Sequence, residues 1–105
     1  MSYDIHIAKD QNQASLKAPD LSITFDEHNK LCSEVELSSK PYLRDILDFY
    51  KDVTIKGSGK QIMLEEIKKL NLNELSETVS EILQKLQKVI KTAIEKGEDI
   101  HFIAD

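Results

Sequence analysis

The sequence has a single cysteine, Cys32, and no apolar run that approaches the roughly 18 residues needed to cross a bilayer. One cysteine cannot form an internal disulfide, so the cysteine content does not point to an oxidising compartment. The N-terminus lacks a basic region followed by a long apolar stretch, which is the pattern of a secretory signal. These absences predict a cytoplasmic protein with no membrane partner.

Basic residues are fewer than acidic residues. The 105 residues include 14 lysines and arginines against 19 aspartates and glutamates, which gives a net charge of −5. This charge opposes non-specific attraction to nucleic-acid phosphates, so we expect no nucleic-acid partner. Hydrophobic residues make up 40% of the chain, enough to bury a core. The length suits one core, and we expect residues 1–105 to form a single domain.

Several short stretches alternate hydrophobic and polar residues, as strands with one buried face do. Both ends of the chain show this pattern, at about residues 3–9 and after Gly97, and each contains Asp-Ile-His. The alternation places the isoleucines on a buried face and His6 and His101 on the opposite, solvated face. The polar stretch between residues 10 and 20 indicates a loop.

A hairpin is the interpretation that the next pattern favours. Leucine, isoleucine and phenylalanine alternate over residues 21–25, and a second alternating run covers residues 31–37. The stretch DEHNK between them resembles a turn, because aspartate and asparagine are common turn formers. The sequence therefore predicts two antiparallel strands in this region.

Helical spacing begins further along the chain. A helix is predicted to start near Ser39, with Pro41 in its first turn, where a missing N–H costs little. Residues 53–64 fit either a hairpin or a short strand and turn that lead into a helix. Apolar residues at helical spacing beyond Gly59 favour the second interpretation.

The longest helix is predicted over residues 72–96, where apolar residues recur every three or four positions. Asn71 and Glu74 have the spacing of a capping box, and Gly97 stands where a left-handed C-terminal cap is expected. The combined pattern predicts an α+β fold. It is a small two-layer domain in which a mostly antiparallel sheet, including both terminal strands, packs against two or three helices, the longest of them C-terminal.

Histidines offer one candidate for chemistry. His6 and His101 could share a metal if the terminal strands are neighbours. A structural zinc site usually shows paired ligands at close spacing, and here only His28 and Cys32 form such a pair. The ordinary explanation is that these are surface histidines, so we predict no metal and no cofactor.

Two other motifs resemble catalytic or nucleotide-binding sequences only in part. IKGSGKQ fails as a Walker loop, because Thr54 replaces the earlier glycine and Gln61 replaces the later serine or threonine. The backbone amides of Gly57–Gly59 could still hold an anion, although a tight turn is the simpler explanation. FDEHNKLC combines Asp, Glu, His and Cys, but adjacency in a turn does not make these groups converge. The sequence therefore predicts a protein that is not an enzyme.

Acidic residues are concentrated in the first half of the chain. Residues 1–52 carry ten acids and six bases, whereas residues 53–105 carry nine and eight. Such a surface suits a basic protein partner, because complementary charge speeds association. Tyrosine and phenylalanine close to the acids could anchor the interface. The predicted partner-binding residues are Asp26, Glu27, Glu34, Glu36, Tyr42, Asp45 and Asp48.

These observations lead to one main hypothesis and two alternatives. The main hypothesis is an inhibitor that binds another protein: a bacterial immunity protein or antitoxin that neutralises a basic toxin, for example a nuclease, through its acidic surface. The first alternative is a small metal- or anion-binding domain or enzyme that uses His6 and His101 or the Gly57–Gly59 loop. The second is a homodimer formed through the long helix.

Overall fold

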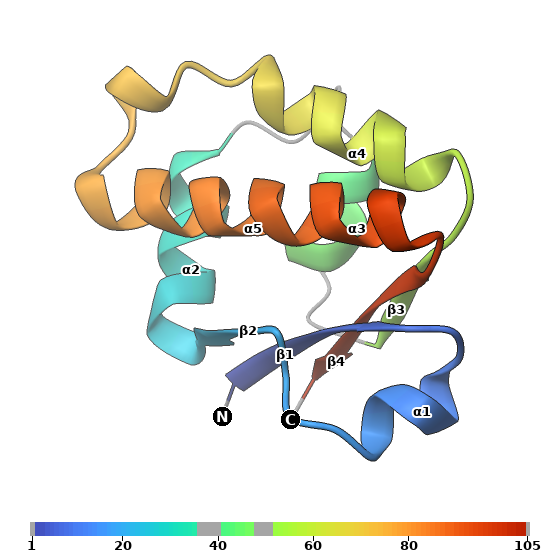
Figure 1. Cartoon of the computed structure of the whole chain (residues 1–105). Coiled ribbons are helices and arrows are strands. Elements are labelled where there is room, and N and C mark those ends of the chain that lie inside the picture. Colours follow the sequence, from blue (N-terminus) through green and yellow to red (C-terminus); the bar gives the residue numbers. More distant parts are fainter. Residues whose placement is uncertain (1, 36–40, 48–51, 105) are drawn as a thin grey trace.

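The computed structural model describes residues 2–35, 41–47 and 52–104. Figure 1 shows a sheet covered on one side by a layer of helices. In chain order the elements are β1 (Ser2–Ala8), α1 (Gln11–Ser15), β2 (Leu21–Thr24), α2 (Phe25–Glu34), α3 (Pro41–Leu47), β3 (Val53–Ile55), α4 (Gly59–Lys68), the 3₁₀ helix η1 (Leu72–Glu74), α5 (Glu77–Lys96) and β4 (Asp99–Ala104).

The four strands form one antiparallel sheet in the order β2-β1-β4-β3. The strands from the two ends of the chain are therefore its two central strands, and β2 and β3 are its edges. Helix α5 lies across one face of the sheet and α4 packs on α5, while α1 lies on the opposite side of the sheet (Figure 1). The α+β fold with both terminal strands in one sheet is confirmed.

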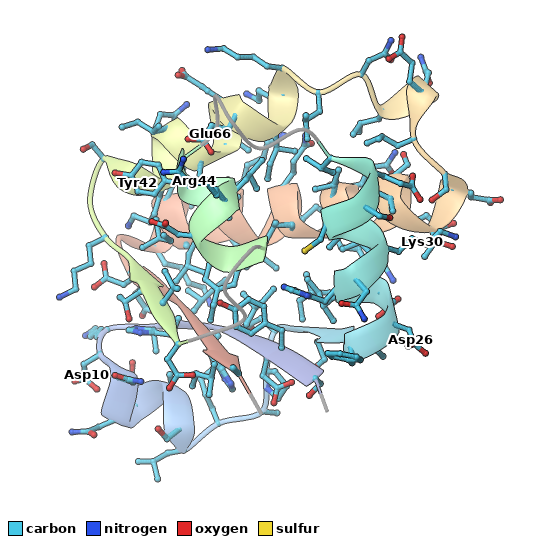
Figure 2. The ribbon with its side chains drawn as sticks, turned by 180° about the vertical axis from the view of Figure 1, so that it is seen from behind. Asp10, Asp26, Lys30, Tyr42, Arg44 and Glu66 are labelled. Carbon is cyan, nitrogen blue, oxygen red and sulfur yellow. The ribbon has the colours of Figure 1, made fainter. Side chains whose placement is uncertain are left out.

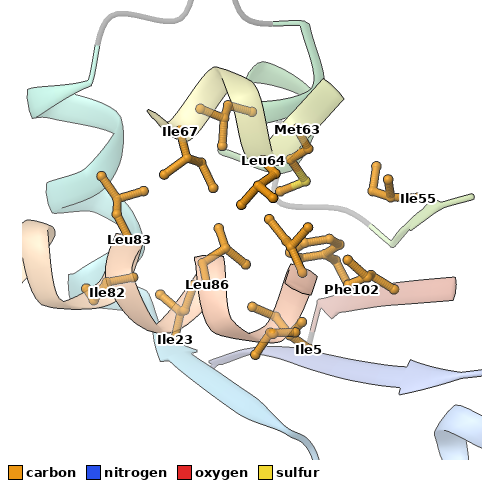
Figure 3. Close-up of a cluster of buried hydrophobic side chains, with 14 of the residues drawn as sticks. Ile5, Ile23, Ile55, Met63, Leu64, Ile67, Ile82, Leu83, Leu86 and Phe102 are labelled. Carbon is orange, nitrogen blue, oxygen red and sulfur yellow. The ribbon is translucent and has the colours of Figure 1, made fainter. Parts of the chain in front are cut away.

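The core lies between the sheet and its helical layer. Alternate residues of β1, beginning with Tyr3 and Ile5, are fully buried there, as the period of two predicts. Helix α5 contributes a matching stripe that includes Leu83 and Leu86, and α4 adds Met63 and further aliphatic side chains (Figure 3). The apolar stripe of α5 is thus occupied by intramolecular packing.

The predicted hairpin is wrong in its second strand, because α2 follows β2 directly. Thr24 is the N-cap of α2: its hydroxyl accepts from the N–H of Glu27, and the Glu27 carboxylate accepts from the N–H of Thr24. This is a capping box, and it starts a helix where the sequence predicted the end of a strand and a turn. His28 and Leu31 are buried at helical spacing. Residues 36 and 37 of the expected strand lie outside the described residues.

Other predictions hold with small changes. Pro41 is the first residue of α3, while Ser39 lies outside the described residues. Residues 53–68 form the favoured strand, turn and helix. The expected loop over residues 10–20 contains the short helix α1, whose N-cap Asp10 accepts from the N–H of Gln13 at 2.7 Å.

The long helix begins later than its sequence suggested. Asn71 caps η1, and the N-cap of α5 is Ser76, whose hydroxyl accepts from the N–H of Val79 at 3.3 Å. The C-terminal cap is confirmed, since Gly97 has a φ of 66°, in the left-handed region that glycine adopts without strain. Within the described residues, no helix is both long enough and apolar enough to span a membrane.

Candidate functional site

His6 and His101 face each other directly across β1 and β4, as the metal hypothesis required. They do not lie on a solvated face: His6 is 5% exposed and His101 is 2% exposed. The prediction of surface histidines is wrong because α1 packs against β1 on the side of the sheet opposite α5 and buries Ala14 completely (Figure 1).

The two rings differ in their hydrogen bonding. His101 Nε2 lies 3.2 Å from the carbonyl oxygen of Ala8, and Nδ1 lies 3.1 Å from the hydroxyl of Thr54. A carbonyl can only accept, so Nε2 carries the proton, and in the neutral ring Nδ1 accepts from Thr54. His6 Nδ1 is buried and has no hydrogen-bond partner among the described residues. Both ring nitrogens of His101 therefore already make hydrogen bonds within the domain.

No group of three or more metal-ligating side chains occurs among residues 2–35, 41–47 and 52–104. The pair His28 and Cys32 lies on α2, one helical turn apart, with Sγ 3.9 Å from His28 Nδ1. The His28 and Tyr3 rings also pack nearly perpendicular to each other, with the ring centroids 5.8 Å apart. Asp26 is exposed, whereas His28 is buried, so the mixed motif does not converge on a common point.

The Gly57–Gly59 loop leads into α4 as a tight turn. Gly57 has a φ of 51°, and Gly59 is packed so closely that an added Cβ would lie 3.0 Å from Cε1 of Tyr42. Lys60 is buried, and its ammonium donates to the carbonyl oxygen of Glu98 at 2.7 Å. This lysine joins the start of α4 to the residue that precedes β4. The loop geometry gives the anion hypothesis no positive support.

The predicted partner-binding acids have different roles in the fold. Asp26 is exposed in the first turn of α2 (Figure 2). Glu27 is half-buried and is part of the capping box described above. Glu34, at the end of α2, accepts a hydrogen bond from the N–H of Ser76 at 2.8 Å. Glu36 and Asp48 lie outside the described residues.

Helix α3 carries the other predicted residues. Tyr42 is half-buried against Gly59, and Asp45 is half-exposed. The N-terminus of α3 is held by Glu66 of α4, whose carboxylate accepts from the N–H of Leu43 at 3.0 Å and of Tyr42 at 3.4 Å (Figure 2). Helices α2 and α3 contact each other, so the acids of α2 and of α3 belong to adjoining helices.

Phe25 is the residue that sequence reasoning misplaced. The alternation put it on the buried face of a strand, but it is the first residue of α2 and is 43% exposed. It stands beside Asp26, at the end of an edge strand. The signal that could have placed it is the spacing of Thr24 and Glu27, because a threonine followed three residues later by glutamate marks a helix start.

A pH prediction follows from the Glu34 contact. The hydrogen bond from the Ser76 backbone, with smaller help from its hydroxyl and from Lys30, lowers the pKa of Glu34 below its ordinary value of 4.5, against opposing desolvation. A depressed native pKa stabilises the fold above pH 4.5, and the benefit is lost as the pH falls through the native value. Glu34→Gln should therefore flatten the dependence of unfolding free energy on pH between about pH 5 and about pH 3.

Urea unfolding at a series of pH values measures this effect. Glu81→Gln is the matched control, because Glu81 is exposed on α5 and makes no hydrogen bond in the described part of the chain. The control should keep the pH profile of the parent protein. Parallel profiles for the Glu34 variant and the parent would contradict the assigned role of the carboxylate.

Comparison with known protein families, with curated proteins and with solved structures finds no match to this chain.

Proposed function

We propose that this protein acts by binding a basic protein, as a bacterial immunity protein or antitoxin does when it neutralises a toxin such as a nuclease. The observation that carries the proposal is the exposed pair Phe25 and Asp26 in the first turn of α2. An aromatic side chain beside a carboxylate combines an apolar anchor with a charge. Aromatic residues are enriched in interfaces, and charge complementarity selects the partner.

The charge of the whole chain supports the same proposal. At −5, the protein attracts a basic partner at long range, and this attraction weakens as salt screens it. The positively charged cleft of a nuclease has the complementary sign. In this scheme Asp26 contributes mainly to the association rate, whereas Phe25 contributes mainly to the lifetime of the complex.

Affinity capture from a lysate of the source organism, with washes at low and then high salt, identifies the partner by mass. The expected partner is one stoichiometric basic protein whose activity falls when this chain is added. Capture without inhibition of any activity would contradict the inhibitor proposal, and so would a captured partner that is acidic and insensitive to salt.

Two variants then test the residues with that partner. Asp26→Lys should slow association about tenfold at low salt, and Glu81→Lys, which changes the net charge equally but lies on α5, should slow it much less. Phe25→Ala should instead raise the dissociation rate about tenfold, as the loss of an interface anchor does. Equal effects of the two charge reversals would show that only net charge matters and that α2 is not the contact.

A further inference from the structure

The face of the sheet opposite α5 is covered only in part. Of the described helices, α1 alone lies on that side, beneath the end of β1 that leads into it (Figure 1). His6 and His101 are buried there. Further toward the start of β1 the same face becomes accessible: Asp4 is half-exposed, and Ser22, its partner on β2, is exposed. We call this part the open outer face; it comprises Ser2, Asp4, Ser22, Thr24 and Ile103.

The charge of this face is negative. The four strands contain two aspartates, Asp4 among them, and no lysine or arginine. Two further exposed acids flank the open outer face, since Asp26 follows β2 and Asp52 precedes β3. The lysines that adjoin the strands, Lys9 and Lys56, follow β1 and β3 at the opposite end of the sheet. Charge complementarity therefore favours a basic partner at the open outer face.

Asp4 has a fixed side-chain position on this face. The hydroxyls of Ser2 and Ser22 both donate to its Oδ1 oxygen, at 3.0 Å and 2.8 Å. The Oδ2 oxygen makes no hydrogen bond within the part of the chain that the structure describes. Because two hydrogen bonds already restrict the carboxylate, it loses little conformational freedom when a partner binds. Asp4 is thus a preorganised acceptor with one unused oxygen.

Arginine is the basic side chain that fits this acceptor best. Its planar guanidinium has five N–H donors in a fixed geometry and forms charge-assisted hydrogen bonds with carboxylates. One N–H can donate to Asp4 Oδ2, and a second can donate to the Ser22 hydroxyl, whose own hydrogen is directed to Asp4. The apolar stem of the arginine can pack on half-buried Ile103, which lies opposite Asp4 on β4. A lysine offers a point charge without this fork.

The position of the open outer face also limits its occupant. Thr24 is the last residue of β2 and precedes Phe25 and Asp26, so this face adjoins the exposed pair on α2. A second copy of this chain would bring two negative faces together, and like charges across an interface are unfavourable. The occupant that fits is therefore the same basic protein that would contact Phe25.

We propose that Asp4, held by the hydroxyls of Ser2 and Ser22, binds an arginine side chain of the basic partner on the open outer face. This inference rests on the proposed function and deepens it, because it extends the contact from the first turn of α2 onto the sheet and names the side chain that is recognised.

The test uses the whole chain labelled with ¹⁵N and the synthetic peptide Ac-RLRLR-NH₂ as the probe. Amide chemical shifts should change at residues 2–4, 22–24 and 103–104 when the peptide is added. A matched peptide with citrulline in place of each arginine keeps the shape without the charge, and it should bind at least about tenfold more weakly. A lysine version keeps the charge without the planar fork and should bind about threefold more weakly.

Protein variants locate the contact. Asp4→Asn should weaken binding of the arginine peptide about fivefold at low salt, because the amide can still accept from both serines but carries no charge. Asp99→Asn is the matched control: it removes the same charge from the same face, opposite Ala8 at the end that α1 covers, and should weaken binding less than about twofold. Ser22→Ala keeps the charge but frees Asp4, and it should weaken binding about twofold.

Several outcomes would overturn the inference. These are peptide-induced shifts only elsewhere in the chain, equal binding of the citrulline peptide, no shift at millimolar peptide, and equal losses in the Asp4 and Asp99 variants. Shifts of the same amides that depend on protein concentration without peptide would also overturn it, because a second copy would then occupy the face.

Failure of this inference and failure of the proposed function give different results. A captured basic partner that binds Asp4→Asn as tightly as the parent would overturn the arginine contact and leave the proposed function intact. Binding of the arginine peptide at Asp4, together with a captured partner that is acidic and insensitive to salt, would overturn the function and leave the arginine contact established.

Discussion

Glu66→Gln should lower the free energy of unfolding by about 2 kcal/mol, because it disturbs a buried carboxylate that accepts two backbone hydrogen bonds. The carboxylate oxygens hold the N–H groups of Tyr42 and Leu43 in the first turn of α3. The amide of glutamine can accept one of these bonds through its oxygen, but its NH₂ group then faces the other N–H donor. Urea unfolding at neutral pH measures the loss.

The adjacent residue supplies a matched control. Glu65 is exposed on the same helix, so Glu65→Gln removes the same charge and should change stability by less than about 0.5 kcal/mol. Trypsin gives a local readout, since Arg44 is an exposed cleavage site within α3. Cleavage after Arg44 should be faster in the Glu66 variant than in the Glu65 variant. Equal rates and equal midpoints would show that Glu66 does not hold α3.

The parts of the fold that the sequence predicted are those determined by local periodicity. In β1 the alternation placed Tyr3 and Ile5 on the core face correctly, although His6 and Ala8 on the opposite face are buried too. In α5 the regular apolar stripe spans five turns, so the helix was recognisable even though its first residue was not. Periodicity is insensitive to where an element ends, which is why the helix start shifted from 72 to Glu77.

The predictions were wrong where a helix cap, or a segment distant in the sequence, determines the local structure. Alternation over four residues fits β2, but the capping box of Thr24 and Glu27 then starts α2, and two patterns competed in the same stretch. Helix α1 is a single turn with too few residues to show a period. Because α1 was not predicted, the burial of His6 and His101 was not predicted either.

The roles of the acidic residues also depend on distant segments. The partners of Glu34 and Glu66 come from segments 42 and 23 residues away in the sequence, so local pattern could not predict them. Composition alone does not distinguish an acid on the surface from one that holds a helix end. The structure separates Glu34 and Glu66, which accept backbone N–H groups of other segments, from Asp26, which is exposed beside Phe25.

Substitution of His101 should also lower the free energy of unfolding strongly. His101→Phe keeps a flat ring between the strands but removes both hydrogen bonds, and it leaves the carbonyl of fully buried Ala8 without its ring N–H donor. Each lost hydrogen bond costs about 1 kcal/mol, so we expect a loss of about 2 kcal/mol. The measurement is urea unfolding at pH 8, with hydrogen exchange of the α1 amides as a local readout.

His6→Phe is the matched control, because His6 lies directly opposite His101 in the same strand pair and its Nδ1 makes no hydrogen bond within the part of the chain that the structure describes. The same change in ring size at this position removes a buried nitrogen that gains nothing from the fold, so stability should stay within about 0.5 kcal/mol of the parent or rise. If both variants lose the same free energy of unfolding, the change in ring size, and not the loss of hydrogen bonds, explains the loss of stability. The expected asymmetry would instead establish His101 as the structural link that joins β4 to Ala8 and to Thr54 of β3.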